Sequence, residues 1–358
     1  MLTAEFWPTL ENNRKRRCVS VRSAKLVDIG KFQLEEVPVP EIQKPTDVLV
    51  AVKAVGVCGT DLHIFKSGRA DVKFPRVMGH ELTGLVQKVG CAVTKIKVGD
   101  RVALDPVFAC GECSACRKGY PNVCEHVCCY GVQMDGGYQD YIVVDQKHLF
   151  VFSPSISYET AALAEPFSIA SNILDRASLK EGETILIIGS GTIGLAVLQT
   201  AKMMGAHAII SDIIDEKLKL AKKMGADHTI NSNTESLQKV ARSVAPDGFD
   251  VIVDAVGTTP LFRQAVDLAG PRSRIICIGF DARTLDIPLD IITKKELSII
   301  GSRMNCFRFP VVMEWINEGK ICADEMITRR YSVEQIQKAF EESIKDGGKS
   351  IKTLILFD

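Results

Sequence analysis

The sequence lacks an excess of charge of either sign, because 44 Lys and Arg residues balance 44 Asp and Glu residues. No global electric field therefore draws the chain to nucleic acid or to an anionic membrane surface. It also lacks any apolar run that approaches the length of a membrane-spanning helix. Internal repeats and low-complexity tracts are absent too. These absences argue against nucleic-acid-binding, membrane-spanning and repeat proteins, and they favour an ordinary globular protein.

We also expect no secretory leader. The charged residues 13–17 follow the apolar residues of the N-terminus, whereas a signal peptide has the opposite order. We interpret residues 1–20 as a disordered N-terminal extension, with Val21 as a candidate first residue of the native protein. Twelve cysteines without a leader do not indicate a disulfide framework. We expect a reducing, cytoplasmic location with metal-bound thiolates.

The chain does contain enough apolar residues for more than one core. Of its 358 residues, 46% are hydrophobic and 25% are charged, and this length predicts two domains. Residues 21–153 show short strand patterns broken by Gly and Pro, which is typical of a mostly β region. Apolar strands then alternate with helical segments, as in a doubly wound parallel sheet. These strands are predicted at residues 184–188, 207–211, 249–254, 274–278 and 297–300. A helix over residues 309–318 and a closing strand over residues 351–356 are expected to return to the first domain.

A glycine-rich turn opens the parallel-sheet region. Gly189-Ser190-Gly191-Thr192-Ile193-Gly194 follows the first apolar strand and begins a helical segment, the context that a dinucleotide-binding fingerprint requires. Gly189 allows the tight turn, Gly191 lets the backbone approach a pyrophosphate, and Gly194 lets helix and strand pack closely. With Thr192 and Ile193, these glycines are predicted to bind the cofactor at a helix N-terminus, whose free N–H groups favour an anion.

The second strand of this region ends at Asp212. Its carboxylate could accept hydrogen bonds from the adenosine ribose hydroxyls and would repel a 2′-phosphate, so we predict NAD rather than NADP. The alternative is a glycine turn in another kind of α/β domain, with Asp212 as the N-cap of a helix.

Four cysteines form a C-x2-C-x2-C-x7-C array: Cys110, Cys113, Cys116 and Cys124. Such neighbouring thiolates can surround one tetrahedral Zn²⁺ in a closed structural site. An iron–sulfur cluster uses related spacings, but its fourth cysteine usually precedes a proline or lies further along the chain. Free thiols are the other alternative, although a surface loop offers them no apolar interior. His126 could replace one ligand, and Cys128 and Cys129 are interpreted as packing residues.

Further candidate ligands are dispersed along the chain. They lie in Cys58-Gly59-Thr60-Asp61-Leu62-His63, in Gly79-His80-Glu81-Leu82-Thr83-Gly84 with Gly90 beyond it, and in Ala164-Glu165-Pro166. Together with the cysteine array and the glycine fingerprint, these segments resemble those of the zinc-containing medium-chain alcohol and polyol dehydrogenases, in the same order. The resemblance covers nearly all of residues 21–358. It implies an α/β protein with a GroES-like β-rich catalytic domain of residues 21–164 and 305–358, and a Rossmann domain of residues 165–304.

The resemblance also implies a catalytic zinc in the cleft between these domains. Cys58 and His80 would be its ligands, and Glu81 and Glu165 would complete its coordination directly or through water. The simpler alcohol dehydrogenases have a second cysteine at the position of Glu165, so this chain groups with sorbitol-, threonine- and sugar-acid-type enzymes.

The family's proton relay has matching residues here. Thr60 would take the proton of the substrate hydroxyl, and His63 would pass it to solvent. A zinc ion with an open position supports this chemistry, because as a Lewis acid it lowers the pKa of a bound hydroxyl. The alternative for His63 is a surface histidine beside a short helix.

The substrate is the least constrained prediction. Gly279 and Ser302 resemble backbone turns that line the nicotinamide, and Arg303 and Asn305 lie close to that end of the cleft. A guanidinium can bind a carboxylate bidentately, and an amide can bind hydroxyls. The sequence departs here from the Arg-Tyr pair of mammalian sorbitol dehydrogenases. We predict NAD-linked oxidation of a secondary alcohol in a polyol or a hexonate-like sugar acid; the alternative is that Arg303 forms a surface ion pair.

Two other functions stay open. One is oxidation of an amino alcohol, as in L-threonine 3-dehydrogenase, and the other is binding of zinc and NAD without turnover. The joint presence of Thr60, His63 and Glu165 argues against a protein that only binds. The strand at residues 297–300 resembles the edge along which family members pair, so we expect a homodimer or homotetramer that acts on a small polyhydroxylated substrate.

Overall fold

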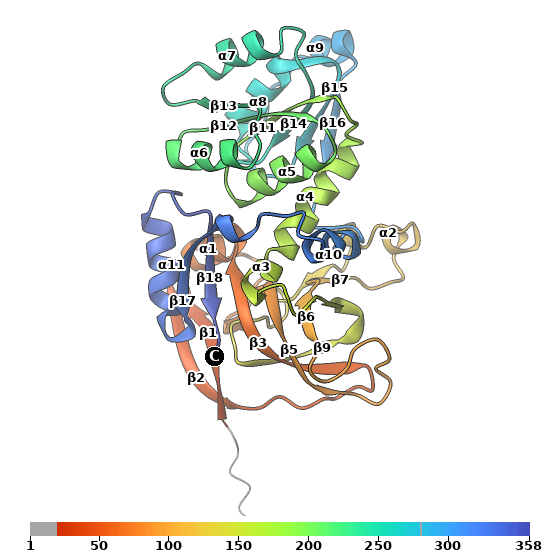
Figure 1. Cartoon of the computed structure of the whole chain (residues 1–358), viewed down its shortest axis with the longest axis vertical. Coiled ribbons are helices and arrows are strands. Elements are labelled where there is room, and N and C mark those ends of the chain that lie inside the picture. Colours follow the sequence, from red (N-terminus) through yellow and green to blue (C-terminus); the bar gives the residue numbers. More distant parts are fainter. Residues whose placement is uncertain (1–19, 280) are drawn as a thin grey trace, which may run out of the picture.

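The computed structural model describes residues 20–279 and 281–358, which form two lobes, one above the other in Figure 1. Within these residues, the upper lobe holds a six-stranded parallel sheet in the order β13-β12-β11-β14-β15-β16. Its strands are β11 (Thr184–Ile188), β12 (His207–Asp212), β13 (His228–Asn231), β14 (Phe249–Asp254), β15 (Ala269–Cys277) and β16 (Ser298–Gly301). The doubly wound sheet is thus confirmed. Its strand order reverses between β11 and β14, the position at which such sheets bind ligands.

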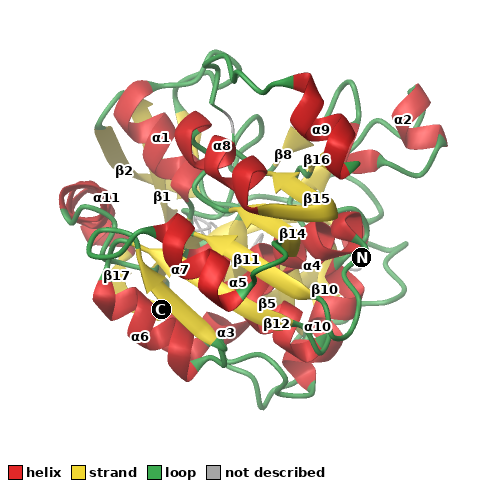
Figure 2. Ribbon diagram, turned by 90° about the horizontal axis from the view of Figure 1, so that it is seen from above, coloured by secondary structure: helices red, strands yellow, loops and turns green. Residues whose placement is uncertain are grey.

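Helices cover both faces of this sheet (Figures 1 and 2). One face carries α4 (Ala164–Ala177), α5 (Thr192–Met203) and α6 (Asp215–Lys223), and the other carries α7 (Leu237–Val244), α8 (Thr259–Leu268) and α9 (Leu289–Lys295). Alternate residues of β11 supply the two cores, because Ile185 and Ile187 pack on the first side and Leu186 and Ile188 on the second. Burial on both faces explains why the strands are continuous apolar runs.

The lower lobe is rich in β-structure. Its largest sheet has the order β10-β6-β5-β3-β18-β17 with β9 beside β3, and the smaller sheets are β2-β1-β4 and β7-β8. The strands are β1 (Ser20–Asp28), β2 (Lys31–Pro38), β3 (Asp47–Val57), β4 (Arg76–Val77), β5 (Glu81–Val89), β6 (Arg101–Leu104), β7 (Val107–Phe108), β8 (Cys128–Cys129), β9 (Tyr141–Asp145), β10 (Leu149–Val151), β17 (Ile327–Ser332) and β18 (Lys352–Leu356). Because β18 pairs with β3, the chain returns to the first lobe after the parallel sheet, as predicted.

Five α-helices complete the described part of the lower lobe: α1 (Gly59–Ser67), α2 (Ser114–Arg117), α3 (Tyr158–Ala162), α10 (Phe309–Asn317) and α11 (Ile336–Lys345). Short 3-10 turns lie at η1 (Pro121–Val123), η2 (Gln146–His148), η3 (Asp324–Met326) and η4 (Val333–Gln335). Helix α4 extends from the parallel sheet down to the lower lobe in Figure 1. One apolar cluster contains Ile187 of β11, Leu163 before α4, Phe309 of α10 and Leu354 of β18, so both lobes contribute to a shared core.

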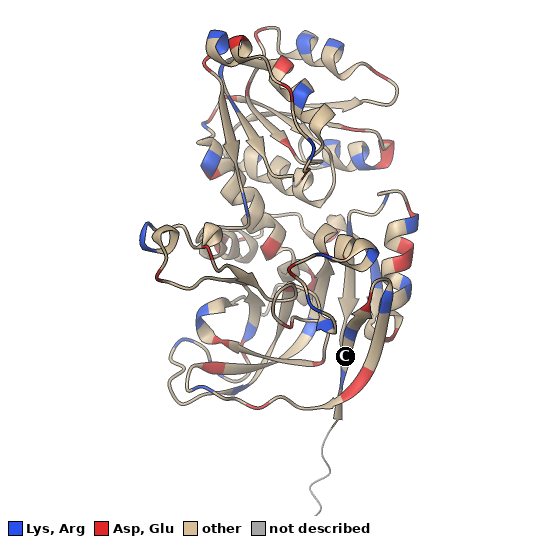
Figure 3. Ribbon diagram, turned by 180° about the vertical axis from the view of Figure 1, so that it is seen from behind, with Lys and Arg blue, Asp and Glu red and all other residues tan. Residues whose placement is uncertain are grey.

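Charged residues of both signs are mixed along the chain, and Figure 3 shows Lys and Arg segments interspersed with Asp and Glu segments on both lobes. None of the helices in residues 20–279 and 281–358 is long and apolar enough to cross a membrane. The predicted extension of residues 1–20 lies outside the described residues except for Ser20, which begins β1.

Candidate active site and metal centres

Cys58 lies where β3 ends and α1 begins. It is the N-cap residue of α1, and the Asp61 carboxylate closes a capping box by accepting a hydrogen bond from the Cys58 N–H at 3.0 Å. This arrangement satisfies free donors of the first helical turn and fixes the backbone of Cys58. The local sequence, with a short acid three residues after the cap, therefore sets the position of the thiol.

His80 lies in the turn before β5, and Glu81 is the first residue of β5. The preceding Gly79 has a φ of +92°, and a Cβ there would lie 2.8 Å from a Val55 methyl and 2.9 Å from the Tyr138 ring. Only glycine fits this conformation and this space. His80 and Glu81 are both buried, and ligand atoms of Cys58, His80 and Glu81 all lie within 4.8 Å of one another. The structure thus brings together three of the predicted zinc ligands.

Asp61 connects the first two of these ligands. Its Oδ1 lies 3.5 Å from His80 Nδ1, and both atoms are buried without another partner among the described residues. The Tyr138 hydroxyl donates to Asp61 Oδ2 at 3.2 Å. Burial opposes a charge on His80, but the neighbouring Asp61 and Cys58 raise its pKa well above the usual value. An imidazole turned to a carboxylate through Nδ1 leaves Nε2 for a metal, as ligating histidines commonly do.

Glu81 is held by a lysine that the sequence did not reveal. Lys352 of β18 places Nζ 2.7 and 2.6 Å from the two carboxylate oxygens of Glu81 and 3.2 Å from the Val57 carbonyl oxygen. Burial opposes the charge on Lys352, but attraction to Glu81 and Cys58 raises its pKa above the ordinary value. Gly56 provides the space, since a Cβ there would lie 1.8 Å from Glu81 Oε2.

Glu165 is the second residue of α4 and is buried. It lies outside the group of three close ligands, although it is near enough to interact with the charges of His80 and Glu81. Burial raises the pKa of Glu165 to about 7, while His80 acts in the opposite direction. The thiol of Cys58, the imidazole of His80 and the nearby carboxylates of Glu81 and Glu165 are ligand types that bind a catalytic Zn²⁺. The Asp61 carboxylate, which faces His80 Nδ1, completes the fit.

The two residues of the predicted proton relay lie on α1. Thr60 is half-buried and His63, three residues later, is exposed. Residues three apart lie on the same side of a helix, so the half-buried hydroxyl and the exposed imidazole are on one side of α1.

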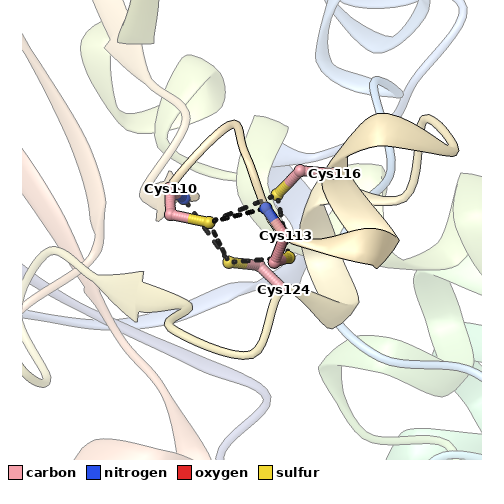
Figure 4. Close-up of side chains that lie close together, drawn as sticks. All are labelled: Cys110, Cys113, Cys116 and Cys124. Carbon is pink, nitrogen blue, oxygen red and sulfur yellow. Dashed lines mark hydrogen bonds between the residues drawn. The ribbon is translucent and has the colours of Figure 1, made fainter.

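The four-cysteine lobe (residues 109–126) has the geometry of a metal site (Figure 4). Its sulfur–sulfur distances are 3.4 Å for Cys110–Cys124, 3.5 Å for Cys113–Cys116, 3.8 Å for Cys113–Cys124 and 3.9 Å for Cys110–Cys116. Four sulfurs about 2.3 Å from a central zinc would stand about 3.8 Å apart. Backbone N–H groups of Cys110, Cys113 and His126 point at these sulfurs. His126 therefore meets the cluster through its backbone, and the four thiolates alone suffice for a closed tetrahedral site.

The glycine fingerprint has the local geometry that its spacing predicts. Gly189, with a φ of +99°, makes the turn after β11, and Gly191 is the N-cap residue of α5. A Cβ on Gly194 would lie 1.9 Å from the Gly189 carbonyl oxygen, whereas one on Gly191 would meet no atom within 4 Å. Gly194 is therefore needed for packing, and Gly191 leaves the helix N-terminus open to a ligand. Thr192 begins α5, and its hydroxyl donates to the Ile351 carbonyl oxygen at 2.6 Å.

Asp212 ends β12 beside this turn. Its Oδ2 accepts hydrogen bonds from the Ser190 N–H at 2.7 Å and the Ser190 hydroxyl at 2.9 Å. Its Oδ1 accepts from the N–H groups of Ile213 and Ile214. The N-cap residue of α6 is Ile214, so the alternative in which Asp212 caps that helix is not what the structure shows.

The remaining predicted contacts follow β15 and β16. Gly279 approaches Gly257 so closely that a Cβ on either would lie within 2.4 Å of the other's backbone. Ser302 is half-buried, and its N–H donates to the Cys277 carbonyl oxygen at 2.9 Å. Arg303 is exposed, whereas Asn305 is 2% exposed and donates from Nδ2 to Asp105 Oδ1 at 3.1 Å. Arg303 is therefore open to solvent, whereas Asn305 is occupied by a contact within the protein, so its predicted role as a substrate contact is not what the structure shows.

Comparison with known proteins identifies the family. The family model of the alcohol dehydrogenase GroES-like domain matches residues 44–154, and the family model of the zinc-binding dehydrogenase matches residues 192–318. The chain belongs to the zinc-containing medium-chain alcohol and polyol dehydrogenase family, and it is an NAD(P)-dependent dehydrogenase by class.

Several relatives align over nearly the whole chain. The starvation-sensing protein RspB of Escherichia coli K12 is 36% identical over 90% of this chain and 94% of its own length. Sorbitol dehydrogenase of Bacillus subtilis is 33% identical over 94% and 97%, and L-idonate 5-dehydrogenase of Vitis vinifera is 33% identical over 93% of each chain. A crystal structure of the rspB alcohol dehydrogenase of Escherichia coli CFT073 with NADH superposes with a TM-score of 0.89, at 34% identity, over 94% of this chain and 99% of that one.

Proposed function

We propose that this protein catalyses the zinc-dependent, NAD-linked oxidation of a secondary alcohol in a polyol or a hexonate-like sugar acid. The observation that carries this proposal is the close group of Cys58, His80 and Glu81, of which His80 and Glu81 are buried, with the carboxylate of Glu165 nearby. The names of two relatives, a sorbitol dehydrogenase and an L-idonate 5-dehydrogenase, support a polyol and a sugar acid respectively.

In this proposal Cys58 and His80 hold the catalytic zinc, with Glu81 or Glu165 as the carboxylate. Zinc at such a site supplies Lewis acidity, which lowers the pKa of an alcohol hydroxyl toward neutrality. The half-buried Thr60 accepts the hydroxyl proton, and the exposed His63 returns it to solvent. Asp61 keeps the His80 ring oriented through Nδ1.

A dinucleotide would be held at the carboxyl ends of β11, β12, β14 and β15. Gly191, Thr192 and Ile193 at the N-terminus of α5 would bind its pyrophosphate, and Gly279 and Ser302 would line its nicotinamide. Asp212 favours NAD, because its negative charge repels a 2′-phosphate. The NADH-bound rspB structure supports this choice.

Arg303 is proposed as the substrate carboxylate's partner, because its side chain is exposed on the chain segment that follows Ser302. A guanidinium–carboxylate pair would make hexonates better substrates than hexitols. We also propose a cytoplasmic homo-oligomer whose subunits pair along β16, the exposed edge of the parallel sheet, and a catalytic domain of residues 21–164 and 305–358 around a Rossmann domain of residues 165–304.

The test is NAD reduction followed by nicotinamide absorbance, with zinc supplied, on matched hexitols and hexonates and on L-threonine. We expect hexonates to have the highest kcat/KM, and we expect Arg303→Ala to raise their KM without affecting hexitols. Arg242→Ala, which removes an exposed arginine of α7, is the control. Preference for hexitols or L-threonine would refute the role of Arg303. Binding of NAD without its reduction by any substrate would instead support the alternative in which the protein binds zinc and NAD without turnover.

A further inference from the structure

The chain that leaves β16 has an unusual backbone. Residues 302–308 connect β16 to α10, and they include Ser302 and Arg303 of the proposed cleft. Met304 and Phe307 adopt φ values of +52° and +55°, which residues with large side chains rarely do. Such backbone persists where the surrounding structure holds it.

Side-chain amides hold this segment from two other parts of the fold. Asn172, which is buried on α4, donates from Nδ2 to Ser302 Oγ at 3.2 Å and to the carbonyl oxygens of Met304 at 3.1 Å and Arg303 at 3.5 Å. Asn122 donates from Nδ2 to the same Arg303 carbonyl oxygen at 2.8 Å. The carbonyl oxygen of Arg303 therefore accepts hydrogen bonds from two side-chain amides, those of Asn172 and Asn122.

Asn122 belongs to the four-cysteine lobe. It lies in η1, two residues before Cys124, and is only 7% exposed. A second contact joins the same two segments, since the Cys306 thiol donates to the Gly119 carbonyl oxygen at 3.5 Å. The four-cysteine lobe projects from the lower half of the molecule at α2 in Figure 1. These two contacts nevertheless tie it to residues 302–308, the segment that follows β16.

We propose that Asn122 is a positioning residue through which the four-cysteine lobe fixes the backbone of residues 302–305, and with it the affinity for the nicotinamide half of the cofactor and for the alcohol. The inference rests on the proposed function, because it takes Ser302 and Arg303 to line the cleft. Cys124, two residues further along, anchors Asn122 to the cysteine cluster, so the lobe has a role at the active site in addition to local stability.

The experiment compares Asn122→Ala, Asn172→Ala, the double variant and the zinc-loaded wild type. NADH binding is measured by nicotinamide fluorescence, KM and kcat by alcohol oxidation, and bound zinc by elemental analysis. Each single variant is expected to weaken NADH binding and to raise KM roughly threefold to tenfold, the effect of one neutral hydrogen bond, with zinc content unchanged. Since both amides act on one carbonyl, the double variant should lose less than the product of the two single effects.

Val123→Ala is the matched control, because Val123 is the neighbouring residue of the same turn and is 48% exposed. It should bind NADH as the wild type does. Wild-type NADH affinity in Asn122→Ala, or effects of the two asparagines that multiply fully, would overturn the inference and leave the proposed function standing. Failure of the wild type itself to bind NADH would overturn both.

Discussion

Replacing Lys352 by methionine should destabilise the protein strongly. Lys352 and Glu81 are each about 2% exposed at the side chain, and Nζ lies within 2.7 Å of both carboxylate oxygens. Lys352→Met leaves the Glu81 carboxylate buried without its counter-charge, and breaking a buried pair in this way costs about 3–5 kcal/mol. Since folded proteins are stable by only about 5–15 kcal/mol, the loss should be obvious in urea unfolding followed by circular dichroism.

Two further variants separate charge from packing. Lys352→Arg keeps the positive charge and should retain most of the stability. The double variant Lys352→Met with Glu81→Gln removes both charges, so it should be more stable than Lys352→Met alone. Bound zinc is measured for every variant, because Glu81 also belongs to the candidate metal site. A loss of less than about 1 kcal/mol in Lys352→Met would show that the two groups do not form a buried ion pair.

Four other predictions follow from single contacts. Cys113→Ser should lower the zinc content and the melting temperature together, as elemental analysis and calorimetry would show, whereas unchanged zinc would contradict the closed site. Asp212→Gly should raise kcat/KM for NADP at least about tenfold relative to NAD in steady-state assays. Gly56→Ala should cost roughly 1–3 kcal/mol in urea unfolding, because its Cβ would lie 1.8 Å from Glu81 Oε2. Burial lowers the pKa of His148 from 6.5 to about 4, so the unfolded chain takes up a proton that the folded chain resists. The contribution of His148 to stability should therefore fall by about 2–3 kcal/mol between pH 6.5 and 4, and His148→Phe should remove that contribution.

The features that could be predicted well are those whose residues are contiguous in the sequence. The parallel strands, the fingerprint turn and the four-cysteine array each occupy one short segment, so spacing alone determines which atoms meet. The structure agrees in detail for Gly194, whose missing side chain lets α5 approach the Gly189 carbonyl. Residues that hold a candidate ligand in place from a distant part of the chain could not be found this way. Lys352 reaches Glu81 across 271 positions of the chain, and no local pattern marks a lysine of a closing strand as buried.

Asn305 illustrates a different limit. Its type suited a substrate contact, but its burial and its bond to Asp105 give it a place in the scaffold. Residue type shows which hydrogen bonds a side chain can form, whereas burial determines whether a ligand or the protein receives them. Asp61 shows the reverse case, because its position inside the Cys58 segment was visible while its approach to His80 depends on the tertiary fold.

The end of β3 is where these constraints meet. Gly56 leaves room for the Glu81 carboxylate, the Val57 carbonyl accepts from Lys352, and Cys58 carries the thiol of the candidate zinc site. Three consecutive residues thus fix a carboxylate, a buried cation and a sulfur relative to one another. Because β3 pairs with β18 on one side and β5 on the other, the strands that carry Lys352 and Glu81 are held in register by its backbone. The site is therefore built into the sheet. Substitutions in β3, the strand that directly precedes Cys58, should alter metal binding even where they touch no ligand.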